Sequence, residues 1–459
     1  MRSLPLVSSD HQAHISFAHT APYLRAALLF GSGGGFALAS VLTLAPFFGI
    51  SSVSWWAAAV QTHGHLQIFG WAGLFVAGVA LSFLPRLRGT PLAGSALLPW
   101  ILGMLIASLI LRFISQPLLA VTRVSFWGVL LVLSGVLEAI ALPAIFLVLV
   151  RTTTRKPTTK SAVEGVHSIA PFIFGAFLGL SLAGIVNLLN CIAALAGGGL
   201  VPPAGDQVDS TLGLFGFLVP VALAMSSRML PLYLRIQPFP TQLLQACALA
   251  YFAGVICWLA GILLPGRPSA LLSALGWLLT GLVLLLFTGY SLHLLRKRTL
   301  LPPQTATATP HPEVLVERAR RSRHEEQRRY GPYSGLIGSA YLWASLGTLL
   351  LIIDGIGRLL FGVLPVELDA IRHSFAVGFI SLLICGIAVR VVPGLSGKAI
   401  RSPRLVTATL VLGNAAALLR VGPLLLAPLL PGSMLFFALS GPTGLALVLC
   451  LTINLWPAL

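Results

Sequence analysis

The chain has 459 residues, of which 57% are hydrophobic and only 9% are charged, and its mean hydropathy is +0.94. A soluble domain carries about 25% charged residues, so this composition excludes a soluble globular protein and predicts an all-α polytopic membrane protein. The net charge of +17 reflects basic residues in the loops between apolar segments, so it indicates no nucleic-acid partner. The five cysteines form no CxxC pair, which argues against both a disulfide framework and a thiolate metal site.

In chain order, residues 1–20 are polar and lack the apolar core of a cleavable signal peptide, so we expect a cytoplasmic N-terminal tail. Twelve apolar windows follow, each long enough to cross a bilayer. The polar insertion 295–333 is expected to form a cytoplasmic loop between spans eight and nine, within a single integral membrane domain over 1–459. The predicted spans are 22–49, 55–84, 95–116, 124–150, 168–199, 209–233, 240–264, 269–294, 334–363, 368–393, 403–427 and 432–457.

Basic residues are concentrated in the loops that follow even-numbered spans, whereas the opposite loops are neutral or acidic. Examples are Arg86 and Arg88 after span two, against Asp206 and Asp209 around the start of span six. The positive-inside rule therefore predicts a protein of the cytoplasmic membrane, in contact with lipid, that has both termini in the cytoplasm.

Three segments share one pattern: a His or Thr, a Gly five residues later that an aromatic residue follows, and a Pro fifteen residues after the Gly. They fall in spans two, six and ten, one in each group of four spans, which predicts a threefold pseudo-repeat of parallel four-helix units. The copies consist of His65, Gly70 and Pro85; of Thr211, Gly216 and Pro231; and of His373, Gly378 and Pro393.

Histidines within apolar spans indicate a functional site, and haem or metal ligation is a common reason for them. His63 and His65 are two residues apart, so their side chains point about 200° away from each other on a helix and cannot share one metal without local unwinding. His373 lies at a similar predicted depth on span ten, beside Arg372, which could neutralise a haem propionate. The cofactor and metal candidates are therefore His63, His65 and His373, with Arg372 as a cofactor contact.

Three motifs resemble those of the NnrS family of bacterial membrane proteins. They are HGHLQIFGW from His63, SRMLP from Ser227, and HSFAVG from His373, which continues to RVVPGLSG from Arg390. The resemblance implies a haem- and copper-containing protein of the nitric oxide and nitrosative stress response. Leu66 departs from the acidic residue that the family often has after the second His.

The layout is more distantly similar to subunit I of the haem-copper oxidases and nitric oxide reductases. Those proteins have twelve helices, with haem ligands on helices two and ten, and copper-binding histidines on helices six and seven. Here span six has Thr211 and span seven has no His, so the resemblance implies a single haem b without a binuclear centre. Its ligands would be His63 or His65, together with His373.

The sequence leaves open whether the protein is an enzyme. One alternative is a diverged haem-copper-type oxidoreductase that reduces nitric oxide or oxygen with electrons from a quinol. Another is a membrane transporter without haem, which predicts a polar central cavity lined by Asn187, Asn190 and Glu138.

Overall fold

All twelve predicted spans are helical in the computed structural model, which describes residues 7–50, 54–156, 166–234, 236–297 and 312–459. The described residues contain no β-strand, so the predicted all-α membrane fold is confirmed. Helices are required here because each one satisfies its own backbone hydrogen bonds in an apolar solvent. Large apolar side chains such as Leu249 and Leu342 accordingly cover the outer surface, where they would contact lipid.

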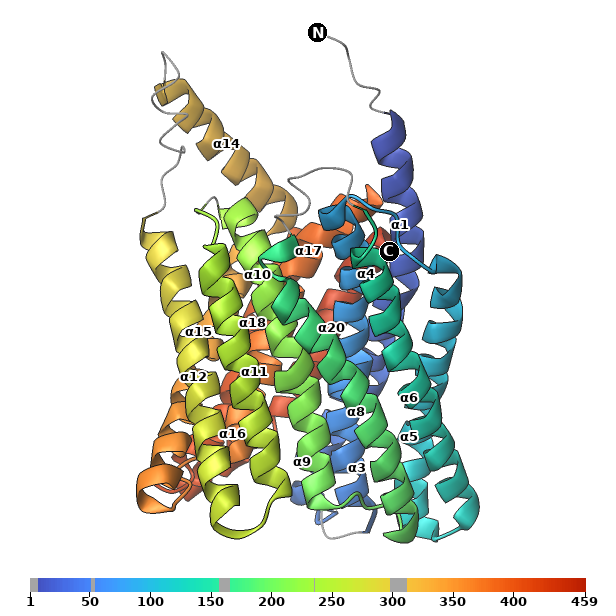
Figure 1. Cartoon of the computed structure of the whole chain (residues 1–459). Helices are drawn as coiled ribbons and strands as arrows, with labels where there is room; N and C mark the ends of the chain where they lie inside the picture. The colour runs from blue at the N-terminus through green and yellow to red at the C-terminus, as the bar shows by residue number, and fades with distance from the viewer. Residues whose placement is uncertain (1–6, 51–53, 157–165, 235, 298–311) are drawn as a thin grey trace.

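The helices are arranged as a bundle whose long axes run roughly side by side, with both termini at the same end (Figure 1). Spans one to five comprise α1 (Val7–Leu29), η1 (Phe30–Gly35), α2 (Phe36–Leu44), η2 (Ala45–Phe48), α3 (Ser54–His65), η3 (Leu66–Gly73), α4 (Leu74–Arg88), η4 (Ser95–Leu97), α5 (Leu98–Thr122), α6 (Ser125–Thr153) and α8 (Ala170–Ala196). Spans six to ten, with the helix that precedes span nine, comprise α9 (Pro203–Thr211), η5 (Leu212–Leu218), α10 (Val219–Leu234), α11 (Thr241–Leu263), α12 (Gly266–Arg296), α14 (Pro312–Tyr330), α15 (Tyr333–Ile356), η6 (Gly357–Phe361), α16 (Leu368–His373), η7 (Ser374–Ser381) and α17 (Leu382–Ser396). Spans eleven and twelve comprise α18 (Pro403–Leu426), η8 (Pro431–Ser433), α19 (Met434–Phe437), α20 (Ser440–Leu455) and η9 (Trp456–Ala458).

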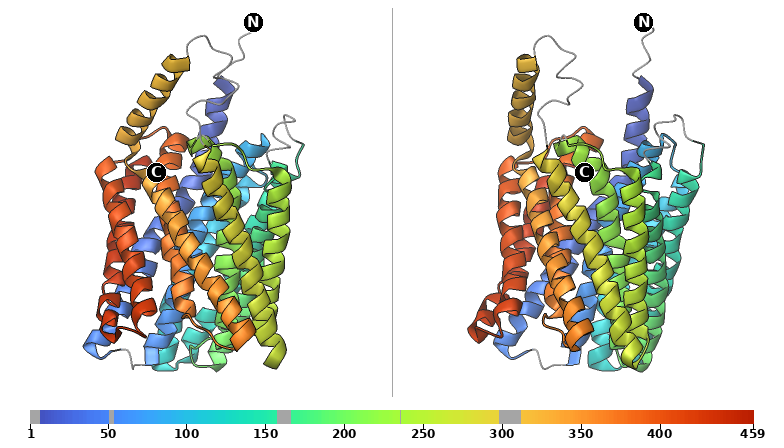
Figure 2. Two further views of the ribbon diagram at one scale, coloured as in Figure 1. Left: turned by 90° about the vertical axis from the view of Figure 1, so that its left-hand side faces the viewer. Right: turned by 60° about the vertical axis from the view of Figure 1, so that its left-hand side comes forward.

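Two predicted boundaries differ from the structure. Helix α1 already begins at Val7, so part of the expected tail 1–20 is a helix that continues into the first span; residues 1–6 lie outside the described residues. Within the expected loop 295–333, α14 forms a helix that projects from the end of the bundle where the termini lie (Figure 2). An ion pair between Glu326 Oε1 and Arg390 Nε, 2.9 Å apart, ties α14 to α17.

The three spans that carry the shared pattern form the centre of the bundle. In spans two, six and ten, 78%, 94% and 72% of the most apolar stretch is buried, against 33–56% in the other nine candidate spans of the described residues. These values place the three spans inside a ring of helices that separates them from lipid.

The shared pattern has a common backbone form. In each central span an α-helix ends at the His or Thr of the pattern, and a π-helical segment begins at the next residue: η3 after His65, η5 after Thr211 and η7 after His373. The π-helices contact one another at the centre of the bundle. π-Helical segments are rare in proteins and often occur at functional sites.

Specific contacts set the positions of the central π-helices. Trp71 Nε1 of η3 donates a hydrogen bond to Ser381 Oγ of η7, at 3.2 Å. The ring of Phe215 in η5 packs edge-on against Phe375 in η7, with ring centroids 5.0 Å apart. These contacts hold the helices that carry the candidate ligands in a defined register.

Candidate functional site

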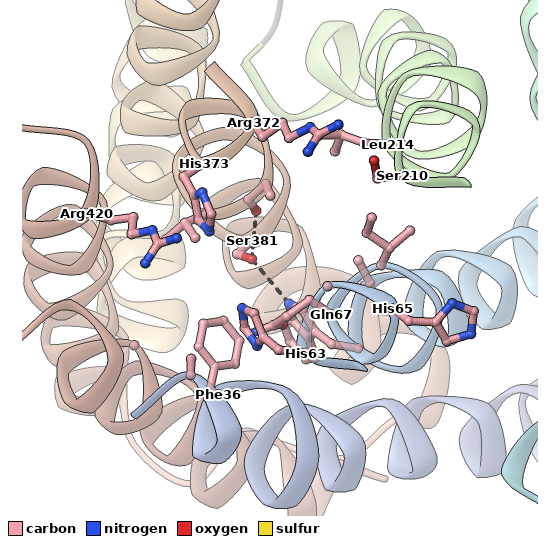
Figure 3. A pocket seen from close by; sticks show the side chains of 18 of the residues that line it. Phe36, His63, His65, Gln67, Ser210, Leu214, Arg372, His373, Ser381 and Arg420 are labelled. Carbon is pink, nitrogen blue, oxygen red and sulfur yellow. Dashed lines mark hydrogen bonds between the residues drawn. The ribbon is translucent and has the colours of Figure 1, made fainter. Parts of the chain in front are cut away.

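A cavity of about 210 Å³ opens between the central spans and spans one, eleven and twelve, in the half of the bundle opposite the termini. Its walls include Phe36 from span one, His63 from span two, Leu214 from span six, His373 from span ten and Arg420 from span eleven (Figure 3). The cavity therefore joins chain segments that are more than 350 residues apart in the sequence.

His63 and His373 face this cavity from two different helices (Figure 3). His63 Nδ1 lies 2.9 Å from the carbonyl oxygen of Gly35, in the π-helix η1 of span one. His373 Nδ1 lies 2.9 Å from the carbonyl oxygen of Asp369 and 3.0 Å from its Oδ1. Since carbonyl and carboxylate oxygens only accept, each Nδ1 carries a proton and donates it. No described residue forms a hydrogen bond with either Nε2, so both of these nitrogens can act as ligands.

Two arginines bring positive charge to the same cavity. Arg420 Nη2 donates to Asp369 Oδ2 at 2.8 Å, and its guanidinium lies over the ring of Phe437. Arg420 Nε and Arg372 Nη2 are buried without a hydrogen-bond partner among the described residues. Buried charged donors without a partner are costly, so an anionic group in the cavity would be stabilised by them.

This donor set fits a haem. Imidazole ligands of a metal usually donate their second ring N–H to a carbonyl or carboxylate, as both histidines do here. A haem also carries two propionates, which need cationic partners such as Arg372 and Arg420. Among the described residues, no group of three or more His, Cys, Asp or Glu side chains is arranged to hold a bare metal ion.

His65 occupies a different environment, and its ring points away from His373 (Figure 3). Its Nε2 lies 2.9 Å from Glu138 Oε2 and its Nδ1 lies 3.3 Å from Asp209 Oδ2. The residue is 3% exposed, and both ring nitrogens are occupied by carboxylates. His65 also borders the cavity, but the two histidines diverge on one helix, and His63 is the one that points toward His373 (Figure 3). The choice of His63 or His65 as the ligand stays a prediction.

The partners of His65 belong to a larger buried network. Glu138 Oε2 also accepts hydrogen bonds from Ser108 Oγ at 3.1 Å and from Asn187 Nδ2 at 3.0 Å. Arg112 donates to Asn187 Oδ1 and to Gln116 Oε1, and it is 1% exposed. One Arg, one His and two carboxylates balance their charges there, as buried ions require.

The same region of the bundle contains the residues that the transporter alternative expects around a polar central cavity. Glu138 and Asn187 bond to each other inside the network, and Asn190 Nδ2 donates to the carbonyl oxygen of Gly205 at 3.0 Å. None of these three residues lines the cavity that contains His63 and His373. The ionisable side chains in the wall of that cavity are histidines, arginines and aspartates, and glutamine, serine and threonine side chains add further polar groups.

Sequence reasoning missed Asp369, Arg420 and the carbonyl of Gly35 as parts of the site. Asp369 was detectable because it precedes His373 by four residues, which places both on one helix face. Arg420 was detectable as a charge well inside the apolar eleventh span, far from Arg404 at its start. Nothing in the sequence identified Gly35 as a hydrogen-bond partner, because every residue has a backbone carbonyl.

Comparisons with known proteins agree with the resemblance seen in the motifs. The family model of NnrS protein matches residues 320–459, a segment that includes spans nine to twelve with His373 and Arg420, and this confirms the predicted resemblance there. No curated protein matches the sequence.

A solved structure described as a heme-copper terminal oxidase dimer, determined by cryo-EM, is similar to the whole chain. The TM-score is 0.64 at 11% identity, and the match covers 98% of this chain and 83% of that chain. At this identity the similarity concerns the fold, so the predicted haem-copper-oxidase-like fold is confirmed. A threefold repeat of the whole chain stays a prediction.

Proposed function

We propose that this membrane protein binds one haem b between spans two and ten, where His63 and His373 would be the residues that ligate it. The observation that carries the proposal is that two imidazoles from different helices face one cavity, each with Nδ1 donating to an oxygen and with Nε2 left for a metal. A planar cofactor ligated from both sides needs this arrangement.

The surrounding residues would position the cofactor. Gly35 and Asp369 fix the ring orientation of His63 and His373, so the two Nε2 atoms are preorganised. Arg372 and Arg420 would pair with the propionates, and the apolar wall from Phe36 and Leu214 would exclude water from the porphyrin faces. When bound, haem supplies an iron that changes between ferrous and ferric states and has affinity for nitric oxide.

The biological role that we propose is in the response to nitric oxide and nitrosative stress, as implied by the resemblance to the NnrS family. The partners would be nitric oxide, or a quinol as electron donor. We place the protein in the cytoplasmic membrane with both termini in the cytoplasm, so that the cavity opens toward the outer half of the bilayer. The location of the termini at one end of the bundle supports this topology.

The central test is optical and metal analysis of detergent-purified protein. We expect a haem b spectrum at one haem per chain, and loss of the band in both His63→Ala and His373→Ala. His293→Ala, at an exposed position near the end of α12, is the matched control and should retain the full spectrum. Monodispersity in size-exclusion chromatography confirms that the variants are folded.

The outcome also separates the alternatives. An unchanged spectrum in His373→Ala would overturn the proposed ligation, and loss of haem in His65→Ala but not in His63→Ala would transfer the ligand role to His65. Copper without haem would assign the two imidazoles to a copper ion. Consumption of nitric oxide with a reduced quinol would establish an oxidoreductase, whereas a protein without haem or metal would favour the transporter.

A further inference from the structure

A second, smaller cavity lies at the centre of the bundle, next to the cavity described above. It measures about 50 Å³, and Leu218 and Ile380 line both cavities, so the two are neighbours separated by this layer of side chains. All twelve residues of its wall are apolar, and they come from the three central spans: Phe75, Val76 and Val79; Leu218, Val221, Ala222, Met225 and Met229; and Ile380, Leu383, Ile384 and Ile387.

The chemistry of the wall determines what this cavity can hold. A buried water needs roughly 10–15 Å³ of such space, so the volume would admit water, but a water also needs two to four polar partners. This wall has no donor or acceptor side chain, and the backbone groups of the three spans are engaged in their own helices. Apolar cavities of this kind stay dry and bind apolar atoms and molecules such as xenon.

The position of the cavity argues against a lipid chain as occupant. Its wall belongs to spans two, six and ten, which are the most buried candidate spans of the described part of the chain. Nine of its twelve wall residues are buried, and the other three, Val76, Ala222 and Ile387, are half-buried. A mostly buried wall around a volume of about 50 Å³ favours a very small molecule.

We propose that this central apolar cavity is a binding site for dissolved gases, meaning uncharged molecules of one or two heavy atoms such as nitric oxide, dioxygen or xenon. Apolar gases concentrate in the membrane interior, and the cavity would hold them one side-chain layer from the larger cavity that His63 and His373 line. The site is defined by packing alone, so it does not depend on the proposed haem.

The test uses xenon as the probe, in xenon-pressurised crystals of the full chain. We expect anomalous density for one xenon atom between spans two, six and ten. Ala222→Phe places a ring in the cavity and should remove the density, and Ala222→Leu provides a smaller obstruction should the first variant fail to fold. Val129→Phe, at a position on α6 that is 60% exposed, adds the same ring outside the bundle and should leave the density unchanged.

Several results would overturn the proposal: no xenon in the unmodified protein, xenon that persists in both Ala222 variants, or water or acyl-chain density in the cavity. Crystals of His373→Ala separate this test from the haem proposal. Xenon should still bind there even if no haem does, whereas failure of both would reject the two proposals independently.

Discussion

Asp369 Oδ1 lies 3.0 Å from His373 Nδ1, one helical turn away on the same face of α16. The other carboxylate oxygen, Oδ2, lies 2.8 Å from Arg420 Nη2 on span eleven. The carboxylate thus orients a candidate ligand and is itself held by a neighbouring helix. His63 has a neutral counterpart, the carbonyl of Gly35, so the two imidazoles are polarised unequally.

Replacing Asp369 by Asn should raise the midpoint potential of the bound haem. The negative carboxylate makes the imidazole of His373 a stronger donor and stabilises ferric iron, and the amide removes that charge while keeping an oxygen acceptor. Loss of such a partner typically weakens metal binding about 10- to 100-fold. A redox titration followed optically, together with haem content, measures both effects.

Asp206→Asn is the matched control for Asp369→Asn, because Asp206 also lines the cavity but has no described hydrogen bond with an imidazole. Asp206→Asn should shift the midpoint potential of the haem less than Asp369→Asn does. An equal shift in both variants would mean that general charge in the cavity, and not the contact with His373, sets the potential.

His65→Ala should destabilise the protein strongly. The substitution removes the partner of Glu138 and Asp209 and leaves two carboxylates facing one arginine, Arg112, in a buried network. Removing one partner of a buried charge pair costs about 3–5 kcal/mol. Thermal denaturation in detergent should show a clear fall in Tm, while the fraction that stays folded keeps its haem.

The comparison for His65→Ala is His63→Ala in haem-free protein. His63 bonds a single backbone carbonyl, so its loss should cost only about 1–3 kcal/mol. Similar Tm values for the two haem-free variants would show that the network around His65 is not a structural element.

Arg372→Gln should weaken haem retention. The Nη2 atom of Arg372 is buried without a partner, so an incoming propionate gains a charge-assisted hydrogen bond there. Such bonds contribute about 1.5–3 kcal/mol, which corresponds to roughly a 10- to 100-fold change in affinity. Transfer of haem to an excess of an acceptor protein measures the loss.

Arg358→Gln controls for the removal of an arginine near the same end of the bundle. Arg358 lies over the ring of Trp277 and does not line the cavity, so haem transfer should keep its original rate. Faster transfer in this variant as well would point to a general weakening of the bundle.

Gly378→Ala should lower stability because the glycine is in close contact with a neighbouring span. A Cβ at this position would lie 2.5 Å from Cβ and Cγ of Trp343 on α15, which cannot be accommodated without a shift of the helices. Overpacking of this kind typically costs about 1–3 kcal/mol. Gly394→Ala, in the same span, would meet no atom within 4 Å and should leave Tm unchanged or higher.

Much of the fold could be predicted from the sequence, because the bilayer imposes one rule on every span. A helix that crosses the membrane must be about 20 residues long and apolar, and this rule can be applied to each segment separately. The twelve spans followed from it, whereas spans two, six and ten were distinguished by their shared pattern of His or Thr, Gly and Pro. The start of helix α1 at Val7 could not be predicted in this way, because the first turns of α1 are polar and the rule applies only to apolar segments.

The candidate site could be predicted only in part. His63, His65 and His373 were recognisable because ionisable side chains are rare in apolar spans, and helical geometry already separated His63 from His65. Nothing in the order of residues indicated which ring would face span ten. That choice depends on how span two is rotated in the bundle, and contacts such as Trp71 with Ser381, 310 residues apart, determine the rotation.

The sequence by itself determined the crossings of the membrane, their number and the identity of the unusual polar groups within them. These properties are local, since each depends on the transfer of one segment into lipid. Only the tertiary structure decided that His63 and His373 face one cavity, that Asp369 and Arg420 support His373, and that His65 is paired with Glu138 and Asp209. Such pairings depend on the packing of helices that are distant along the chain, and packing selects one rotation of each helix among many that are equally apolar.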